Sequence, residues 1–275
     1  MAHAEIDLEA EYNNRARVPD HGVHIAGWQR DAAAYRDTAR CELDLAYGPG
    51  ERNRLDLFYP EGGDAGGPIV LFIHGGYWQA LDKSTASHLA RGANKRGLTV
   101  AMPSYSLAPA VSLPAIVSEI EAAAEFVQQR TGRPLVASGH SAGGHLSACL
   151  MARPDTAPER RIRAAMPISG LFDLVPLVPT SINAALKLTE QEARRLSPLE
   201  WPAPARGRLV AVVGGAESSE FLRQSRTIVD EWGKAGVTTR LHEIPGAHHF
   251  DVIAGLAEPN DILVDLLVEL SSNAS

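Results

Sequence analysis

The stretch Pro134–Gly144, with the sequence PLVASGHSAGG, decides what fold this chain can adopt. Its apolar start predicts a buried strand, and the residues after it, 144–151, predict a buried helix. Between them, residues 139–143 fit the pattern G-x-S-x-G, with Ser141 at the apex of the turn. A strand that turns sharply into a helix with a serine at the turn is typical of a nucleophile elbow. Gly139 and Gly143 suit such a turn, because a Cβ at either position would collide across it.

Strands and helices alternate on both sides of this stretch, which predicts an α/β fold with a mostly parallel central sheet and helices on both faces. The fully apolar run Ile69–Ile73 suits a central strand that is buried on both sides. The other predicted strands are 43–47, 55–59, 98–102, the run into Ser141, 162–168, 209–213 and 238–244. The other predicted helices are 23–40, 84–96, 113–130, 219–234 and 260–271.

Residues 171–204 interrupt this alternation, since they contain several prolines, one predicted short helix near 189–196 and no predicted strand. They follow a strand, so they can fold over the carboxyl edge of the sheet, where open α/β sheets bind ligands. The polar stretch Glu9–Arg15 is expected to be partly irregular. We therefore expect a single domain over residues 1–275, with a small lid at about 171–204 and an N-terminal segment, 1–40, that covers the site.

Composition narrows the class of partner. The chain has 275 residues, of which 45% are hydrophobic and 21% charged, as in ordinary globular proteins. A formal charge of −7 argues against nucleic acid or an anionic membrane as partner, and no apolar run reaches the roughly 20 residues of a membrane span. Cys41 and Cys149 fit neither a disulfide framework nor a metal site. We expect a cytoplasmic protein that acts on a small molecule; a homodimer, formed through the apolar face of the last helix, is left open.

A second motif, His74-Gly75-Gly76-Tyr77-Trp78, directly follows the strand at 69–73. Acyl transfer builds a negatively charged oxygen in the transition state, and backbone N–H groups aimed at that oxygen stabilise it. Paired glycines after a strand let the backbone approach a substrate closely, as in the oxyanion loops of hydrolases. The first N–H groups of the helix after Ser141 point the same way. We assign the oxyanion hole to the N–H groups of Gly75, Gly76 and Ala142.

A nucleophilic serine needs a general base and an acid that orients the base. Histidine suits the base, and His248 and His249 both follow the last predicted strand. The acid should lie between serine and histidine in the chain and follow a strand. Glu217, just past Gly214-Gly215, meets this requirement, with Asp173 as the alternative.

At this point the chain resembles a known group. His74–Trp78, Gly139–Gly143, the segment ESSEFLRQS at Glu217–Ser225, and His249-Phe250-Asp251 resemble α/β-hydrolase serine esterases related to kynurenine formamidase (arylformamidase), with hormone-sensitive-lipase-like esterases as wider kin. The resemblance covers most of the chain from about Tyr12. It implies that Ser141, Glu217 and His249 form a catalytic triad, because the family's base directly precedes Phe-Asp. The family's acid is usually Asp, so the glutamate here is a departure.

The resemblance implies a two-step reaction through an acyl-enzyme, without a metal or organic cofactor. We expect an aromatic, partly polar pocket for the substrate, lined by Tyr77, Trp78, Tyr105, His140, Phe172, Ser181 and Asn183. Hydrolysis of small carboxylic esters ranks first, and an arylformamidase that acts on N-formylkynurenine or a related aryl amide ranks closely second. A ligand-binding relative without activity is disfavoured, because serine, acid and histidine are all present in order.

Overall fold

The computed structural model describes residues 6–63, 66–153 and 162–272, and within them eight strands form one sheet in the order β1-β2-β4-β3-β5-β6-β7-β8. The pairs β1–β2 and β2–β4 are antiparallel, and the others are parallel. The strands are β1 (Cys41–Ala46), β2 (Arg54–Phe58), β3 (Ile69–Ile73), β4 (Val100–Pro103), β5 (Leu135–His140), β6 (Ala164–Ile168), β7 (Arg208–Gly214) and β8 (Thr238–Ile244). The mostly parallel sheet predicted from the sequence is confirmed.

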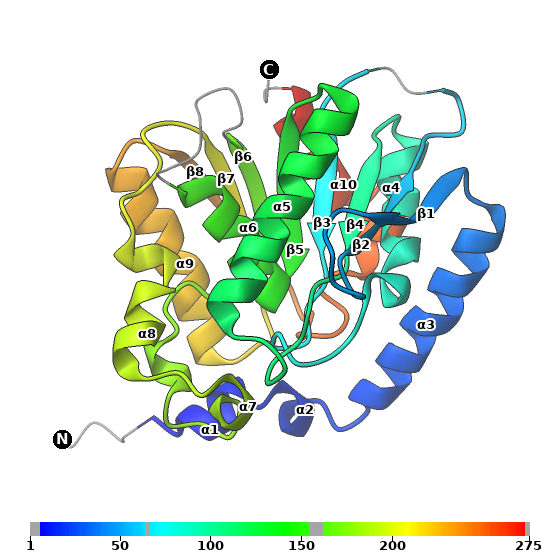
Figure 1. Ribbon diagram of the computed structural model, residues 1–275. Helices are drawn as coiled ribbons and strands as arrows, with labels where there is room; N and C mark the ends of the chain where they lie inside the picture. The colour runs from blue at the N-terminus through cyan, green and yellow to red at the C-terminus, as the bar shows by residue number, and fades with distance from the viewer. Residues whose placement is uncertain (1–5, 64–65, 154–161, 273–275) are drawn as a thin grey trace.

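Helices cover both faces of this sheet (Figure 1). On one face, α5 (Leu113–Thr131), α6 (Ala142–Ala152) and α9 (Ser219–Lys234) pack over the central and later strands. On the other face lie α4 (Ala90–Lys95) and α10 (Ile262–Ser272), with α3 (His21–Thr38) beside them. Every residue of β3, β5 and α6 is buried, which explains why these stretches are apolar rather than amphipathic.

Two segments differ from the prediction. The stretch expected as one helix at 84–96 is divided into the 3-10 turns η1 (Lys83–Thr85) and η2 (Ser87–Leu89), followed by α4. The Asp82 side chain accepts a hydrogen bond from the N–H of Ser84, so a local cap, and not the apolar spacing, sets the first turn. The second segment is the polar one at 9–15, which forms two short helices, α1 (Leu8–Tyr12) and α2 (Asn14–Arg17), each capped by the side chain before it.

The segment 171–204 contains only short helical pieces: η4 (Val175–Leu177), α7 (Asn183–Leu186), α8 (Glu190–Arg195) and η5 (Pro198–Glu200). Together with α1 and α2 it gathers at one end of the sheet, whereas α10 finishes toward the opposite end (Figure 1). Residues 1–5 of the predicted N-terminal segment lie outside the described residues. Among the described helices, none combines the length and the apolar character that crossing a membrane requires.

Candidate active site

Ser141 lies at the turn between β5 and α6 in a conformation that few residues other than glycine adopt, with φ 57° and ψ −117°. A Cβ at Gly139 would collide with the carbonyl oxygen of Gly143, and one at Gly143 with that of Ile73. The Ser141 N–H donates to the carbonyl of Ile168 at 2.8 Å, which joins the turn to the end of β6. The sharp turn therefore depends on both flanking glycines, and it holds the serine at the carboxyl end of the sheet.

Gly75, the first glycine of the pair after β3, packs directly against this serine. A Cβ at Gly75 would lie 3.2 Å from the Cβ of Ser141, and one at Gly76 would collide with the carbonyl oxygen of Ala80. Gly76 also has φ 105°. Ala142 is the first residue of α6, so its N–H has no carbonyl acceptor within the helix. Gly75 and Ala142 therefore lie beside Ser141, and Gly76 lines the same cavity as the serine.

His74 fixes the start of this loop. Its ring stacks on Tyr105 with centroids 4.3 Å apart, and its Nδ1 lies 2.8 Å from the carbonyl oxygen of Gly75. Burial lowers the pKa of His74 from 6.5 to about 4, so the ring is neutral at physiological pH. A neutral ring adds no positive charge to the site, and its role here is to support the glycine loop.

Glu217 and His249 form a buried pair: Nδ1 of His249 donates to Oε2 of Glu217 at 2.7 Å, and the two side chains are only 6% and 1% exposed, respectively. The other carboxylate oxygen of Glu217 accepts hydrogen bonds from the N–H of Gly214 at 2.8 Å and from the Ser169 hydroxyl at 2.5 Å. Three hydrogen bonds therefore hold this carboxylate in place beside the His249 ring.

The alternatives weighed from the sequence lie elsewhere. His248 pairs with Asp251 at 3.2 Å. Asp173 accepts a hydrogen bond from the N–H of Val175 and lies 3.8 Å from an arginine of α9. Neither residue joins the Glu217–His249 pair, so the acid and the base that the resemblance implied are the ones that contact each other.

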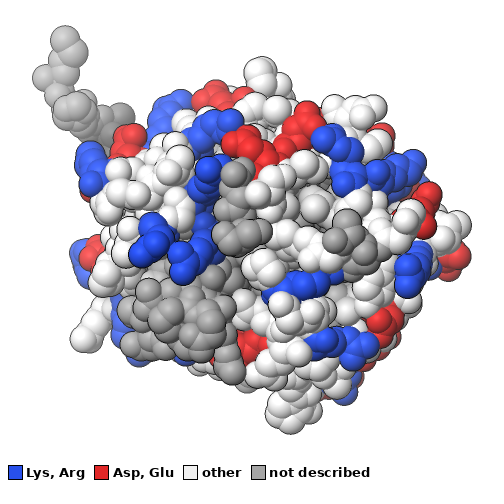
Figure 2. Space-filling view, turned by 90° about the horizontal axis from the view of Figure 1, so that it is seen from above, with Lys and Arg blue, Asp and Glu red and all other residues white. Residues whose placement is uncertain are grey.

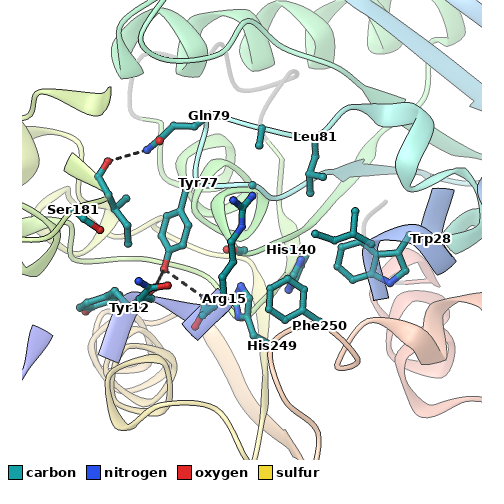
Figure 3. A pocket seen from close by; sticks show the side chains of 17 residues that line it. Tyr12, Arg15, Trp28, Tyr77, Gln79, Leu81, His140, Ser181, His249 and Phe250 are labelled. Atoms are coloured by element: carbon teal, nitrogen blue, oxygen red, sulfur yellow. Dashed lines mark hydrogen bonds between the residues drawn. The ribbon is translucent and has the colours of Figure 1, made fainter. Parts of the chain in front are cut away.

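Ser141 and His249 both line a cavity of about 430 Å³. Figure 3 shows Tyr77, Arg15, His140, Phe250 and Trp28 around it. The described residues that line it come from five parts of the chain: the N-terminal helices, the loop after β3, the turn between β5 and α6, the segment 171–204 and the loop after β8. Of the expected substrate contacts, Tyr77, His140 and Ser181 are among them.

Four expected substrate contacts are not among the residues that line this cavity. Trp78, Tyr105 and Phe172 are fully buried and pack in the core. Trp78 contacts the His145 ring edge-on at 5.1 Å, and the Tyr105 hydroxyl donates to the carbonyl of His74. Asn183 is used inside its own segment, where its side chain bonds the backbone of Val178 and Leu188. For these four residues, an aromatic or amide side chain close in sequence to the glycine loop or in the segment 171–204 did not predict a position on the cavity wall.

His140 contacts the candidate base, since its ring centroid lies 4.7 Å from that of His249. Burial lowers the pKa of His140 well below 6.5, and the charge of His249 lowers it further. His140 therefore stays neutral, and two positive rings do not face each other.

Several residues that line the cavity were not named individually from the sequence, although the segment 1–40 as a whole was expected to cover the site. They are Tyr12, Asn13, Asn14, Arg15, Ile25, Trp28 and Phe250. Trp28 belonged to the predicted apolar face of its helix, and Phe250 follows the predicted base, so both carried a local signal. Residues 12–15 carried none, because their position depends on contacts with residues more than 60 positions away. The Tyr77 hydroxyl donates to the carbonyl of Tyr12 at 2.7 Å, and the Asn14 amide donates to that hydroxyl at 3.4 Å.

The segments around the cavity are also joined to one another. The N–H and the hydroxyl of Ser181 donate to the two carboxylate oxygens of Glu9, at 2.8 and 2.7 Å. The Gln79 amide donates to the carbonyl of Ile182 at 2.9 Å (Figure 3). The segment 171–204 is therefore linked both to α1 and to the loop after β3.

A buried carboxylate–imidazole pair, a serine at a strained strand–helix turn and a glycine loop beside it define a hydrolase of the α/β type. The chain belongs to this family: residues 70–252 match the alpha/beta hydrolase fold. The predicted class, an enzyme of the hydrolase type, is confirmed.

Within this class the chain is 30% identical to kynurenine formamidase from Danio rerio, over 90% of this chain and 88% of that protein. It is 31% identical to kynurenine formamidase from Drosophila melanogaster, over 76% and 74% of the two chains. A solved structure of a candidate thioesterase from Silicibacter sp. TM1040 superposes with a TM-score of 0.86 at 39% identity, covering 96% of this chain and 100% of that one.

Proposed function

We propose that this protein is a serine hydrolase that cleaves small-acyl amides and esters through an acyl-enzyme on Ser141. The observation that carries the proposal is the 2.7 Å hydrogen bond between His249 and Glu217, at a cavity that Ser141 also lines. Nδ1 of His249 is occupied by the carboxylate, which leaves Nε2 to take a proton.

In the proposed mechanism, His249 takes the proton of the Ser141 hydroxyl as the oxygen attacks the substrate carbonyl. The N–H groups of Gly75, Gly76 and Ala142 stabilise the oxyanion. His249 then gives its proton to the leaving amine or alcohol. Water, activated in the same way, releases the acid and restores Ser141. Glu217 stays ionised and stabilises the imidazolium.

The comparisons favour an aryl formamide as the natural substrate, although the sequence ranked esters first. The kynurenine formamidase from Danio rerio matches 90% of this chain, which is more than the family match at 70–252 covers. Trp28, Tyr77 and Phe250 give the cavity aromatic walls that suit an aryl leaving group. We therefore propose a formyl group as the acyl part, and N-formylkynurenine as the substrate.

Short carboxylic esters are the second candidate, and a thioester is included with them because of the candidate thioesterase at 39% identity. The same triad cleaves all three kinds of bond, so the leaving group and the acyl length must distinguish them.

The test measures kcat/KM for N-formylkynurenine, p-nitrophenyl acetate, p-nitrophenyl octanoate and acetyl-coenzyme A. We expect N-formylkynurenine to exceed every other substrate by at least about tenfold, and Ser141→Ala to lower kcat by about 10⁴-fold or more. Ser147→Ala is the matched control, since Ser147 is a buried serine of the same helix whose hydroxyl donates to the Gly143 carbonyl. A preference for acetate esters would restore the ester assignment, and undiminished turnover by Ser141→Ala would refute the mechanism.

We also propose a cytoplasmic location, which is supported by the two cysteines, Cys41 and Cys149, both free in the structure. A homodimer stays a prediction.

A further inference from the structure

Arg15 is the one residue with a permanent charge among the described residues that line the cavity. Its side chain extends from α2 into the space between Tyr77 on one side and His140 and Phe250 on the other (Figure 3). The remaining described lining residues are aromatic, aliphatic, small or neutral polar, apart from the histidines. A single guanidinium thus stands in a mainly uncharged cavity that also contains the candidate nucleophile.

The backbone that carries Arg15 is held in place by its neighbours. The Asn13 side chain accepts a hydrogen bond from the N–H of Ala16 and so caps α2. On the preceding residue, the Tyr12 hydroxyl donates to Glu220 at 2.6 Å and accepts from Gln224 at 2.7 Å. Arg15 is therefore a side chain on a fixed support, able to meet a ligand with little rearrangement of the backbone.

Arg15 has no hydrogen-bond or ion-pair partner within residues 6–63, 66–153 and 162–272. Nearby arginines differ. Arg17, in the same short helix, donates to the carbonyl of Ala10 at 3.5 Å, and Arg223 forms a two-fold ion pair with Glu220. No Asp or Glu is among the described residues that line the cavity, so nothing there neutralises the guanidinium.

We propose that Arg15 determines specificity by binding a carboxylate on the leaving-group part of the substrate. The inference rests on the proposed function, and it narrows the substrate class to amides or esters whose aromatic leaving group carries a carboxylate. A guanidinium binds a carboxylate through two parallel N–H···O hydrogen bonds, which fixes orientation as well as adding affinity.

The net charge of the protein, −7, provides no general attraction for a carboxylate, so the guanidinium of Arg15 is what attracts that group locally. Arg15 is exposed in the free enzyme, and an aromatic substrate stacked between the cavity walls would shield its ion pair from water. Charge-assisted hydrogen bonds of this kind correspond to about 10- to 100-fold in kcat/KM.

The experiment compares two aryl formamides that differ in the arm bearing the carboxylate: N-formylkynurenine, and 2′-formamidoacetophenone, which lacks the amino-acid group. We expect Arg15→Gln to lower kcat/KM for N-formylkynurenine by about 10- to 100-fold, mainly by raising KM, and to change that for 2′-formamidoacetophenone by less than about threefold. Arg15→Lys should recover part of the preference, because it keeps the charge but loses the fork of donors. Arg17→Gln, the same charge change in the same helix, should leave the ratio unchanged.

A binding measurement separates this inference from the proposed function. The affinities of both formamides are measured by calorimetry on Ser141→Ala and on Ser141→Ala with Arg15→Gln. If wild type cleaves neither formamide but Arg15 still confers preference for the carboxylate, the proposed function fails and the inference stands. Equal losses for both ligands, or no preference to lose, would overturn the role of Arg15 even if the enzyme proves to be a formamidase.

Discussion

Glu217 is one methylene longer than an aspartate, and the residues around it show how the extra length is accommodated. Gly214 has no side chain, and a Cβ there would collide with the carbonyl oxygen of Ala247 and lie 3.2 Å from Cγ of Glu217. The turn from Gly214 to Glu217 is closed by a hydrogen bond from the Glu217 N–H to the Gly214 carbonyl. The loop therefore folds back tightly against the segment after β8, and the longer side chain spans the remaining distance to His249.

This geometry predicts that length and charge at position 217 both matter. Glu217→Gln should lower kcat by about 10³- to 10⁴-fold, because a neutral amide neither fixes the tautomer of His249 nor stabilises its charged form. Glu217→Asp should lower kcat by about 10- to 100-fold, because the shorter carboxylate retreats from the 2.7 Å contact. The measurement is steady-state kinetics on N-formylkynurenine and on p-nitrophenyl acetate.

Glu243→Gln provides the control, since Glu243 forms an exposed ion pair with Arg226 at the end of β8. It should retain activity. If Glu217→Asp were as active as wild type, the loop would have to move readily, and the close packing at Gly214 would not restrict it.

At the scale of elements, α9 joins the N-terminal helices to the rest of the molecule. Burial alone would raise the pKa of Glu220, but hydrogen bonds from Arg223 and Tyr12 outweigh it and lower the pKa. Gln224, one residue further, accepts from the N–H groups of Phe172 and Asp173 at the start of the segment 171–204. The family motif ESSEFLRQS thus does two things: its first residue pairs with His249, and the others anchor two segments around the cavity.

Removing the hydrogen bonds between Tyr12 and α9 should make the walls of the cavity less ordered, while Ser141, Glu217 and His249 keep their contacts. Tyr12→Phe leaves the buried Glu220 and Gln224 without the hydroxyl, so the free energy of unfolding should fall by about 1–2 kcal/mol. KM should rise by about three- to tenfold while kcat changes little, because residues 12–15 line the cavity. Urea unfolding and kinetics provide the two readouts.

The comparison variant is Tyr59→Phe, which removes a tyrosine–glutamate hydrogen bond to Glu42 between β1 and β2. It should lower stability modestly and leave KM unchanged. An equal rise in KM in both variants would show that general destabilisation, and not the anchor, controls the cavity.

The bounds of helices and strands could be predicted where the apolar pattern of the sequence agrees with the local hydrogen bonding of the chain. β3 and β8 have the predicted bounds, and α9 begins and ends at the predicted residues. The helix expected at 84–96 is broken because Asp82 caps a tighter turn, and the Lys83 side chain turns inward to pair with Asp56 at 2.8 Å. Such polar contacts connect residues distant in the chain, and no periodicity reveals them.

The residues of the site also divide into those that the sequence predicts and those that depend on contacts between distant segments. Ser141, Gly75, Gly76, Glu217 and His249 each follow a strand, so chain order and sheet topology place them at one edge. The walls of the cavity depend instead on how α1, α2 and the segment 171–204 fold back over that edge. Their contacts, such as that of Ser181 with Glu9, join residues 172 positions apart. Arg15 was therefore not foreseeable as a residue of the cavity.

At the scale of the whole molecule, buried histidines make stability depend on pH. Burial lowers the pKa of His74, His88 and His145 from 6.5 to about 4. Between these pH values the unfolded chain binds protons that the folded protein does not. Stability should therefore be insensitive to these groups above pH 6.5 and fall as the pH drops toward 4, by about 2 kcal/mol for each histidine at pH 5.

Urea unfolding at pH 7.5 and at pH 5.0 measures this loss. His88→Leu tests its origin, because His88 is buried beside α3 and α4 and does not line the cavity. This variant should lose about 2 kcal/mol less than wild type between the two pH values. The same pH dependence in wild type and variant would show that His88 does not contribute to it.

The opposed positions of α1–α2 and the end of α10 have a practical consequence for attaching the enzyme to a surface. The cavity opens beside α1 and α2, whereas α10 finishes at Ser272 toward the other end (Figure 1). That other end carries positive and negative side chains interspersed (Figure 2). Molecules tethered to a bead or electrode through the end of α10 would direct their entrance toward the bulk liquid, and substrate would diffuse in unhindered. Tethering through α1 would turn the entrance against the support.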